Sequence, residues 1–330
     1  MDEFKELIIK AQEIYRKNFP MTTNFERAIF FSWFCATKDC TFCYMSTKKG
    51  TEKARRSTES ILAEIILCKK MRWDIGFLSG GHKAYTHLEF LELLKNIKKT
   101  IKKKIWINIG PLTKEELLLY KPYVRGVVAS IETINLELHK KVCPSKPIEP
   151  FEEMLSEAEK LKLKKAVTII LGLGETLDDF ELLQKFIKKY KINKIHIYAL
   201  NPQKGTAFEK TETPAADYHA TWIAKTRIAF PKIDIQFGIW TDKVNRIGLL
   251  LQAGANSISK FPALRYFNSE QAKALEREIT KTGRKCDGTF TTLPHIDPEK
   301  ELQSLNLNVV LKEKIKVKLE EYLKSMQRIR

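Results

Sequence analysis

The chain has 330 residues and a formal net charge of +18 at pH 7; 43% of its residues are hydrophobic and 30% are charged, as in an ordinary soluble globular protein. It has no N-terminal apolar segment of the signal-peptide kind and no apolar run near about 18 residues, so we expect neither a signal peptide nor a membrane span. Six cysteines are too few for a disulfide framework in a chain this long, which favours a reduced, cytoplasmic location.

Short runs of β-branched and aromatic residues alternate with helical patterns along the chain. An amphipathic helix over 3–17 is followed by strand candidates at 27–34, 75–79, 105–109, 126–131, 166–171, 195–200, 233–239 and 256–259. Helical patterns lie near 58–71, 87–100, 114–121, 150–161, 177–190, 215–228, 244–252, 269–281 and 309–327. Eight strands alternating with helices predict a (β/α)8 TIM-type barrel, with a doubly wound parallel sheet as the alternative.

No linker rich in Gly, Pro or Ser divides the chain, so we expect one structural unit in three segments. Residues 1–26 form an N-terminal helical segment, 27–260 the barrel, and 261–330 a helical C-terminal extension that could fold over the barrel top. Active-site groups of such barrels lie at the C-terminal ends of the strands. The most distinctive sequences, among them a cysteine cluster, SGG, SIET and GLGET, each follow or end a strand candidate, so we expect them on one face.

Lysine-rich runs such as KNIKKTIKKK and KLKLKK supply much of the positive charge. Such runs are typical of solvated helix faces in a thermophile-like protein rich in Lys and Glu. Alternatively, they form a basic face for an acidic partner. We find no interleaved aromatic and basic motif, so nucleic acid is the weaker choice of partner.

Three cysteines, Cys35, Cys40 and Cys43, cluster with the spacing C-x4-C-x2-C. A structural zinc site needs a fourth nitrogen or sulfur ligand, and neither a second CxxC nor a suitably spaced histidine pair accompanies them. A thioredoxin-like CTFC site does not explain the third thiol. Three thiols in a short loop suit a 4Fe-4S cluster with one iron left open to bind a small molecule.

With this cluster, the sequence resembles radical S-adenosylmethionine (AdoMet) enzymes over about residues 25–290. It is most similar to the biotin synthase group, which includes the diiron hydrogenase maturase and methylornithine synthase. The resemblance implies that AdoMet chelates the open iron and is cleaved reductively to methionine and a 5'-deoxyadenosyl radical that abstracts hydrogen from a substrate. The family's usual spacing is C-x3-C-x2-C, so the extra residue here indicates a loop bulge and a distinct subfamily.

The resemblance also implies an AdoMet site at the strand ends. It assigns adenine and cluster contacts to Phe42 and Tyr44, amino-group contacts to Ser79, Gly80 and Gly81, and ribose contacts to Ser130 and Glu132. It also assigns adenine packing to Ile170, the turn of the cofactor site to Gly172, and backbone hydrogen bonds to adenine to the segment around Tyr198 and Ala199. The segment VTIILGLGET departs from the family pattern at Thr168, which replaces a glycine. The family's carboxylate-binding arginine is replaced by Phe151, so the resemblance leaves Lys146 as the nearest cation for that carboxylate.

Biotin synthase holds a second cluster with three cysteines and an arginine on interior strands. The matching positions here are Leu78, Trp106, Ala166 and Ile235, none of which is a ligand, which argues against biotin synthase itself.

The remaining cysteines have different surroundings. Cys68 lies in a helical pattern and is predicted to be a buried small hydrophobe. Cys143 and Cys286 lie in polar, basic loops, where a thiolate is favoured. They are either ligands of an auxiliary cluster or two unrelated loop thiols.

The preferred interpretation is sulfur insertion of the lipoyl synthase type, with an auxiliary cluster as the sulfur donor, on an octanoyl-lysine of an acidic carrier protein that a basic face would steer. As the alternative, without an auxiliary cluster, we expect rearrangement or assembly of a small metabolite or hydrogenase-cofactor precursor. Expected partners are an electron donor such as ferredoxin or flavodoxin, the carrier or a second radical AdoMet subunit, and neither a membrane nor nucleic acid. A non-enzymatic protein that binds an Fe-S cluster or nucleic acid is the remaining alternative.

Overall fold

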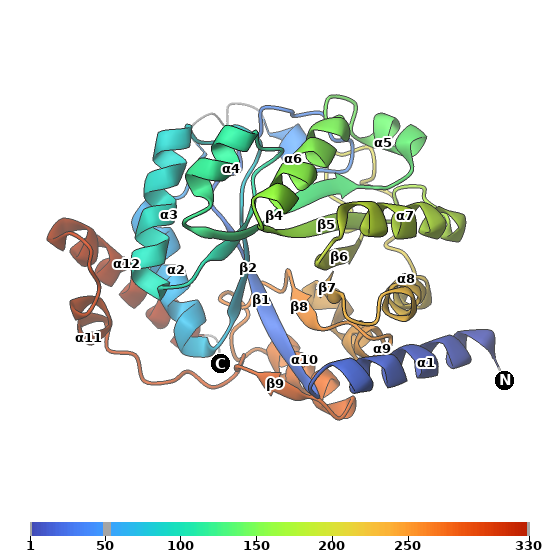
Figure 1. The fold of residues 1–330 in the computed structure, drawn as a ribbon. Coiled ribbons are helices and arrows are strands. Elements are labelled where there is room, and N and C mark those ends of the chain that lie inside the picture. Colours follow the sequence, from blue (N-terminus) through green and yellow to red (C-terminus); the bar gives the residue numbers. More distant parts are fainter. Residues whose placement is uncertain (1, 49–53, 329–330) are drawn as a thin grey trace.

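The computed structural model describes residues 2–48 and 54–328. The first residue of the predicted N-terminal segment 1–26 and the last two of the predicted extension 261–330 lie outside the described residues. Nine parallel strands form one sheet: β1 (Thr22–Phe30), β2 (Asp74–Ser79), β3 (Ile105–Asn108), β4 (Val124–Glu132), β5 (Lys164–Leu171), β6 (Lys194–Ala199), β7 (Asp234–Gly238), β8 (Ser257–Ser259) and β9 (Lys285–Asp287). Because β1 pairs with both β2 and β8, the first eight strands close into a barrel (Figure 1). The (β/α)8 prediction is confirmed.

Helices connect consecutive strands and cover the barrel (Figure 1). They are α1 (Glu3–Asn18), α2 (Thr58–Met71), α3 (His87–Ile101), α4 (Lys114–Tyr120), α5 (Leu136–Val142), α6 (Glu149–Lys160), α7 (Phe180–Tyr190), α8 (Ala216–Ala229), α9 (Ile247–Gln252), α10 (Glu270–Lys281), α11 (Pro298–Gln303) and α12 (Val309–Arg328). Local signals set several starts: Thr86 and Glu89 form a capping box at α3, as Thr113 and Glu116 do at α4. Within the described residues, none of these helices combines the length and apolar character of a membrane span.

Two elements near the ends of the barrel differ from the predictions. The first strand was expected over 27–34, yet β1 ends at Phe30 because the following residues leave the sheet to begin the cysteine loop. The C-terminal extension does not cover the top of the barrel. Its strand β9 pairs with the first residues of β1, at the N-terminal end of the barrel, and α12 packs against α2.

Two layers fill the barrel. An apolar layer of Ala28, Phe77, Trp106, Val128 and Ala166 forms a cluster separate from the main core between barrel and helices. Beneath it, the Lys194 ammonium donates to Glu26 at 2.5 Å and 2.6 Å and to Asp234 at 3.0 Å. These carboxylates compensate the charge of a lysine that is almost completely buried.

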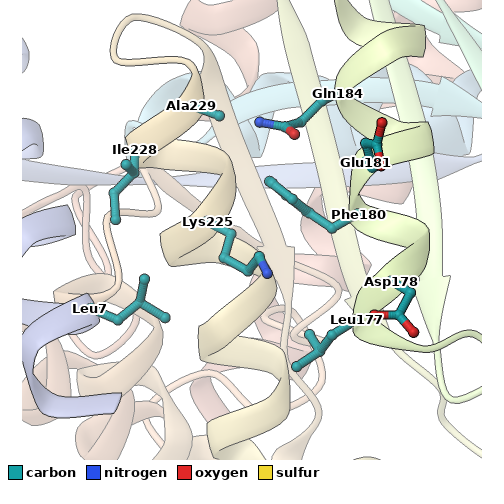
Figure 2. A pocket seen from close by; sticks show the side chains of 9 residues that line it. All are labelled: Leu7, Leu177, Asp178, Phe180, Glu181, Gln184, Lys225, Ile228 and Ala229. Atoms are coloured by element: carbon teal, nitrogen blue, oxygen red, sulfur yellow. The ribbon is translucent and has the colours of Figure 1, made fainter. Parts of the chain in front are cut away.

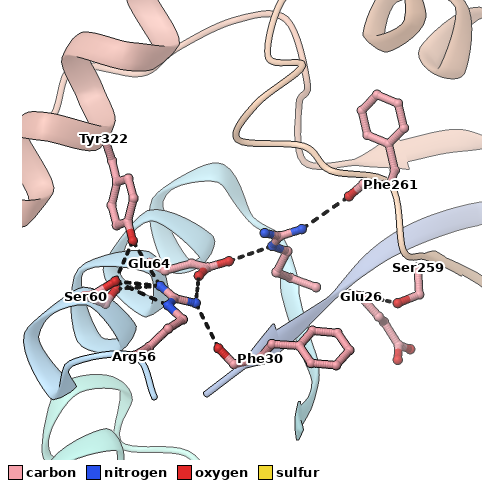
Figure 3. Close-up of polar contacts among 9 residues, drawn as sticks. Glu26, Phe30, Arg56, Ser60, Glu64, Ser259, Phe261 and Tyr322 are labelled. Atoms are coloured by element: carbon pink, nitrogen blue, oxygen red, sulfur yellow. Dashed lines mark hydrogen bonds and ion pairs between the residues drawn. The ribbon is translucent and has the colours of Figure 1, made fainter. Parts of the chain in front are cut away.

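The base of the cysteine loop is anchored by a second buried ionic group (Figure 3). Glu64 on α2 accepts from Arg27 Nε at 2.7 Å and from Arg56 Nη1 at 2.5 Å. The same Arg56 Nη1 donates to the Phe30 carbonyl at 3.1 Å, and its Nη2 donates to the Tyr322 hydroxyl of α12 at 3.0 Å. The group therefore joins the end of β1, helix α2 and the C-terminal helix.

Candidate functional site

A cavity of about 580 Å³ opens at the C-terminal ends of the barrel strands. The structure brings almost all the predicted site residues into its lining: Cys35, Cys40, Phe42, Cys43, Tyr44, Ser79, Gly80, Gly81, Ser130, Glu132, Lys146, Ile170, Tyr198 and Ala199. These residues come from the cysteine loop and from the ends of β2, β4, β5 and β6, with Lys146 from the loop after α5. Their roles toward AdoMet remain predictions, but their gathering in one cavity is a property of the fold.

The cysteine loop is held in place by backbone hydrogen bonds to three neighbouring loops. Ala36 N–H donates to the His82 carbonyl at 2.9 Å, Thr41 N–H donates to the Val142 carbonyl at 2.9 Å, and the Thr41 carbonyl accepts from Ala207 N–H at 3.0 Å. The loop is therefore fixed to the segments that follow β2, β4 and β6.

The donor set fits an iron-sulfur cluster better than a single metal ion. Among the described residues, no three His, Cys, Asp or Glu side chains come close enough together to hold one ion, although three thiols line the same cavity. A cluster of several irons spans more widely separated thiolates. Burial raises the pKa of the Cys43 thiol to about 11, so this thiol needs a bound cation to become a thiolate at neutral pH.

Gly80 and Gly81 are required by the cysteine loop itself. A Cβ on Gly81 would lie 1.8 Å from the Phe34 carbonyl oxygen and 2.6 Å from Cys35 Cα, and one on Gly80 would lie 2.4 Å from the Phe31 ring. The two glycines therefore let the end of β2 pack directly under the first cysteine. From the sequence, the same glycines were predicted to allow a close approach of the backbone to AdoMet.

Glu132, at the end of β4, has an unusual backbone conformation, with φ of +64°, next to a register shift between β4 and β5. A non-glycine residue in this region costs about 1–3 kcal/mol and is typical of functional sites. Its carboxylate accepts from Lys146 Nζ at 2.7 Å, and both side chains are largely buried. Burial alone would lower the pKa of Lys146, but Glu132 and the nearby thiols raise it, so this lysine stays charged.

The pairing with Glu132 bears on the predicted role of Lys146, because its ammonium already has a carboxylate partner. Phe151, which occupies the expected arginine position, lines the cavity as an apolar side chain. Ser130 also has a partner, since its hydroxyl donates to Asn108 Oδ1 at 2.9 Å. Asn108, at the end of β3, lines the cavity and was missed in the sequence, where an isolated Asn after a strand carries no motif.

Gly172, grouped with the cofactor-binding residues because it was predicted to permit a turn, lies outside the cavity lining but does form that turn. It has φ of +96°, and its N–H donates to Glu175 Oε1 at 2.7 Å. The other oxygen of Glu175 accepts from Leu173 N–H at 3.0 Å. The glycine and glutamate of this motif therefore close the turn after β5, because only a residue tolerant of positive φ can begin it.

Cys143 and Cys286 do not come together, so the alternative in which they share an auxiliary cluster is wrong and that of two unrelated thiols holds. Cys143 is buried beside Phe42 and Cys40 at the C-terminal end of the barrel. Cys286 lies in β9 and pairs with Thr23, near the start of β1 and thus at the opposite end. Cys68 is buried in α2, as predicted.

The interior strand positions also need a correction. Leu78 and Ile235 belong to the core between barrel and helices, while the neighbouring Phe77 faces the barrel interior and Gln236 joins its buried polar chain. Trp106 and Ala166 do lie inside. All six cysteines lie elsewhere, so the barrel interior offers no thiol for a cluster of the biotin synthase type.

The Cys143 thiol lies beside Cys40, and its polar S–H group, helped by Lys146, lowers the pKa of the Cys40 thiol. Hydrogen bonds to cluster sulfurs favour the reduced cluster. We expect Cys143→Ala to keep the full iron content and to lower the midpoint potential by about 20–60 mV, the equivalent of one hydrogen bond. A redox titration followed by electron paramagnetic resonance measures this, with Cys286→Ala as control. Loss of iron, or an unchanged potential, would contradict the expectation.

A second hollow lies on the outside of the barrel between α1, α7 and α8 (Figure 2). Leu7, Phe180 and Ile228 contribute apolar side chains, and Lys225 and Glu181 contribute charged ones. It contains none of the predicted site residues.

Comparisons with known proteins show the family to which the chain belongs. The Radical SAM superfamily matches residues 29–187, from the end of β1 into α7. Over 99% of its length the chain is 36% identical to an uncharacterized protein of Methanocaldococcus jannaschii, of which it covers 96%. It is 28% identical to biotin synthase of Clostridium tetani, over 67% of this chain and 70% of that enzyme.

Among solved structures, methylornithine synthase (PylB) has a similar fold, with a TM-score of 0.72 and 18% identity over 86% of this chain and 89% of that one. The superfamily match covers the segment that carries the three clustered thiols. The chain therefore belongs to the radical SAM superfamily and, within it, to the biotin synthase-like group.

Proposed function

We propose that this protein cleaves AdoMet reductively and uses the resulting radical to abstract hydrogen from a small substrate held in the same cavity. The observation that carries the proposal is the convergence of the three clustered thiols with the residues at the ends of β2, β4, β5 and β6 around one cavity of about 580 Å³. When bound, the cluster and AdoMet supply the electron transfer and the 5'-deoxyadenosyl radical.

The chain's own residues would hold the cluster, orient AdoMet and exclude water from the cavity. Cys35, Cys40 and Cys43 would hold the cluster, and Glu132, which is paired with Lys146, would accept hydrogen bonds from ribose hydroxyls. Phe42, with only 9% of its surface exposed, keeps water from one wall of the cavity. An electron donor such as ferredoxin or flavodoxin would deliver the electron.

Within this chemistry we propose rearrangement or assembly of a small metabolite in preference to sulfur insertion of the lipoyl synthase type. Sulfur insertion needs a second cluster as sulfur donor, and the two cysteines assigned to it lie at opposite ends of the barrel. A second radical AdoMet subunit or an acidic carrier protein is then not required for the reaction.

The test is anaerobic reconstitution with iron and sulfide, followed by reduction in the presence of AdoMet. We expect about four irons per chain and the formation of 5'-deoxyadenosine, which chromatography measures. Heat-inactivated protein with the same iron and sulfide is the control. A protein that binds the cluster and AdoMet but forms no 5'-deoxyadenosine under reduction would overturn the proposal and leave the cluster with a structural role.

A further inference from the structure

Lys260 follows β8 and lines the site cavity, although no sequence motif includes it. Its ammonium nitrogen lies 5.1 Å from the ring centroids of Phe30, Phe77 and Tyr198. These rings come from three different strands, β1, β2 and β6. A Cβ on Gly238 would lie 2.9 Å from Lys260 Cγ, so the missing side chain there leaves room for the lysine.

The Lys260 ammonium has aromatic neighbours, and Glu132 is the nearest carboxylate that acts on it, from beyond ion-pair distance. Among the described residues, no carboxylate lies within 4.0 Å of it and no protein oxygen accepts a hydrogen bond from it, whereas the buried lysines Lys146 and Lys194 each have a carboxylate partner. Burial accordingly lowers the pKa of Lys260 to about 8. A cation out of water without a partner is costly, and a ligand anion would remove that cost.

The aromatic surface under Lys260 is fixed from below. The Tyr198 hydroxyl donates to Gln236 Oε1, Gln236 Nε2 donates to Glu26 at 2.5 Å, and Glu26 is held by Lys194. Because its hydroxyl is engaged in the barrel interior, Tyr198 presents its ring, not its hydroxyl, to the lysine. The site is therefore preorganised before any ligand binds.

We propose that Lys260 binds a carboxylate of the substrate, and thereby orients the substrate across the apolar wall formed by Phe30, Phe77 and Tyr198. This deepens the proposed function and rests on it. A carboxylate fits better than a phosphate, because the other lysine of the lining, Lys146, is already paired with Glu132 and a dianion would need more than one donor. The substrate class is a small carboxylic acid with a flat or apolar body.

Benzoate is a suitable probe, and benzamide is its uncharged analogue of the same shape. We expect calorimetric titration of the reconstituted, AdoMet-loaded protein to show benzoate binding about tenfold or more tighter than benzamide. In Lys260→Met the benzoate affinity should fall to that of benzamide, and in Lys260→Arg it should recover most of the loss. Lys164→Met, an exposed lysine at the start of β5, is the matched control.

Three results would overturn the proposal: equal affinities for benzoate and benzamide in the wild type, unchanged benzoate affinity in Lys260→Met, or tighter binding of phenyl phosphate than of benzoate. Weakened AdoMet binding in Lys260→Met would also overturn it, because the lysine would then serve the cofactor. Formation of 5'-deoxyadenosine without substrate should persist in the control variant Lys164→Met. If the wild type forms none, the proposed function fails while the benzoate result still stands.

Discussion

The triple variant Cys35→Ala, Cys40→Ala, Cys43→Ala is expected to hold no iron after anaerobic reconstitution and to form no 5'-deoxyadenosine from AdoMet. These thiols line one cavity together. The other three cysteines lie far from one another, Cys68 in helix α2, Cys143 beside Cys40 and Cys286 in strand β9. A lone thiol does not hold an iron-sulfur cluster, so removing the set should remove all the iron. Iron and sulfide per chain, measured with the ultraviolet-visible spectrum, report the result.

The variant Cys68→Ala, Cys286→Ala serves as the control, because it removes two thiols that lie away from the cavity and should keep the wild-type iron content. Two or more irons per chain remaining in the triple variant would contradict the expectation. Such iron would reveal a second cluster and return sulfur insertion to consideration.

The barrel was predictable because each strand is a short apolar run and each helix has its own period and cap. β5 and β6, for example, were located within about two residues. Which residues of a strand face the barrel interior was not predictable. Assigning Leu78 and Ile235 to the interior was an error of one position, and in a strand one position exchanges the two faces of the sheet. In β2 the buried neighbours Phe77 and Leu78 lie on opposite faces and are both apolar, so the pattern does not reveal that error, and in β7 the polar Gln236 is the residue that faces the interior.

Most of the cavity lining was predictable, because its residues follow strands and match family motifs. Lys260 carried a weak signal, a single charge directly after the last barrel strand. Its significance depends on three rings from strands far away in the sequence, which no local pattern contains. The placement of Cys286 was missed for the same reason: strand β9 joins the sheet through pairing with β1, more than 250 residues earlier.

The second large effect is expected on the stability of the fold, when the charge of Glu64 is removed. Only 2% of its side chain is exposed, and it is flanked by Arg27 and Arg56. Burial by itself would raise the pKa of Glu64, but the two arginines lower it below its ordinary value. Removing the charge leaves two largely buried guanidinium groups without an anion, which is more costly than the loss of a surface ion pair.

We therefore expect Glu64→Gln to lower the free energy of unfolding at pH 7 by about 3–5 kcal/mol, since glutamine keeps the shape but not the charge. Urea unfolding measures the difference. Glu181→Gln, which removes an exposed pair with Lys185, is the control and should cost no more than about 0.5 kcal/mol. A loss in Glu64→Gln as small as in the control would show that the buried group contributes little.

The pH dependence of this difference in unfolding free energy shows whether the charge of Glu64 causes it. Because the pKa of Glu64 is lower in the folded protein than its ordinary value of 4.5, the stabilisation is complete above that value and is lost as pH falls through the folded pKa. The stability difference between wild type and Glu64→Gln should thus be constant between pH 7 and about pH 5 and shrink at lower pH. A difference that stays constant down to pH 3 would mean that Glu64 acts through packing, and that Arg56 holds the Phe30 carbonyl at the base of the cysteine loop without help from its carboxylate.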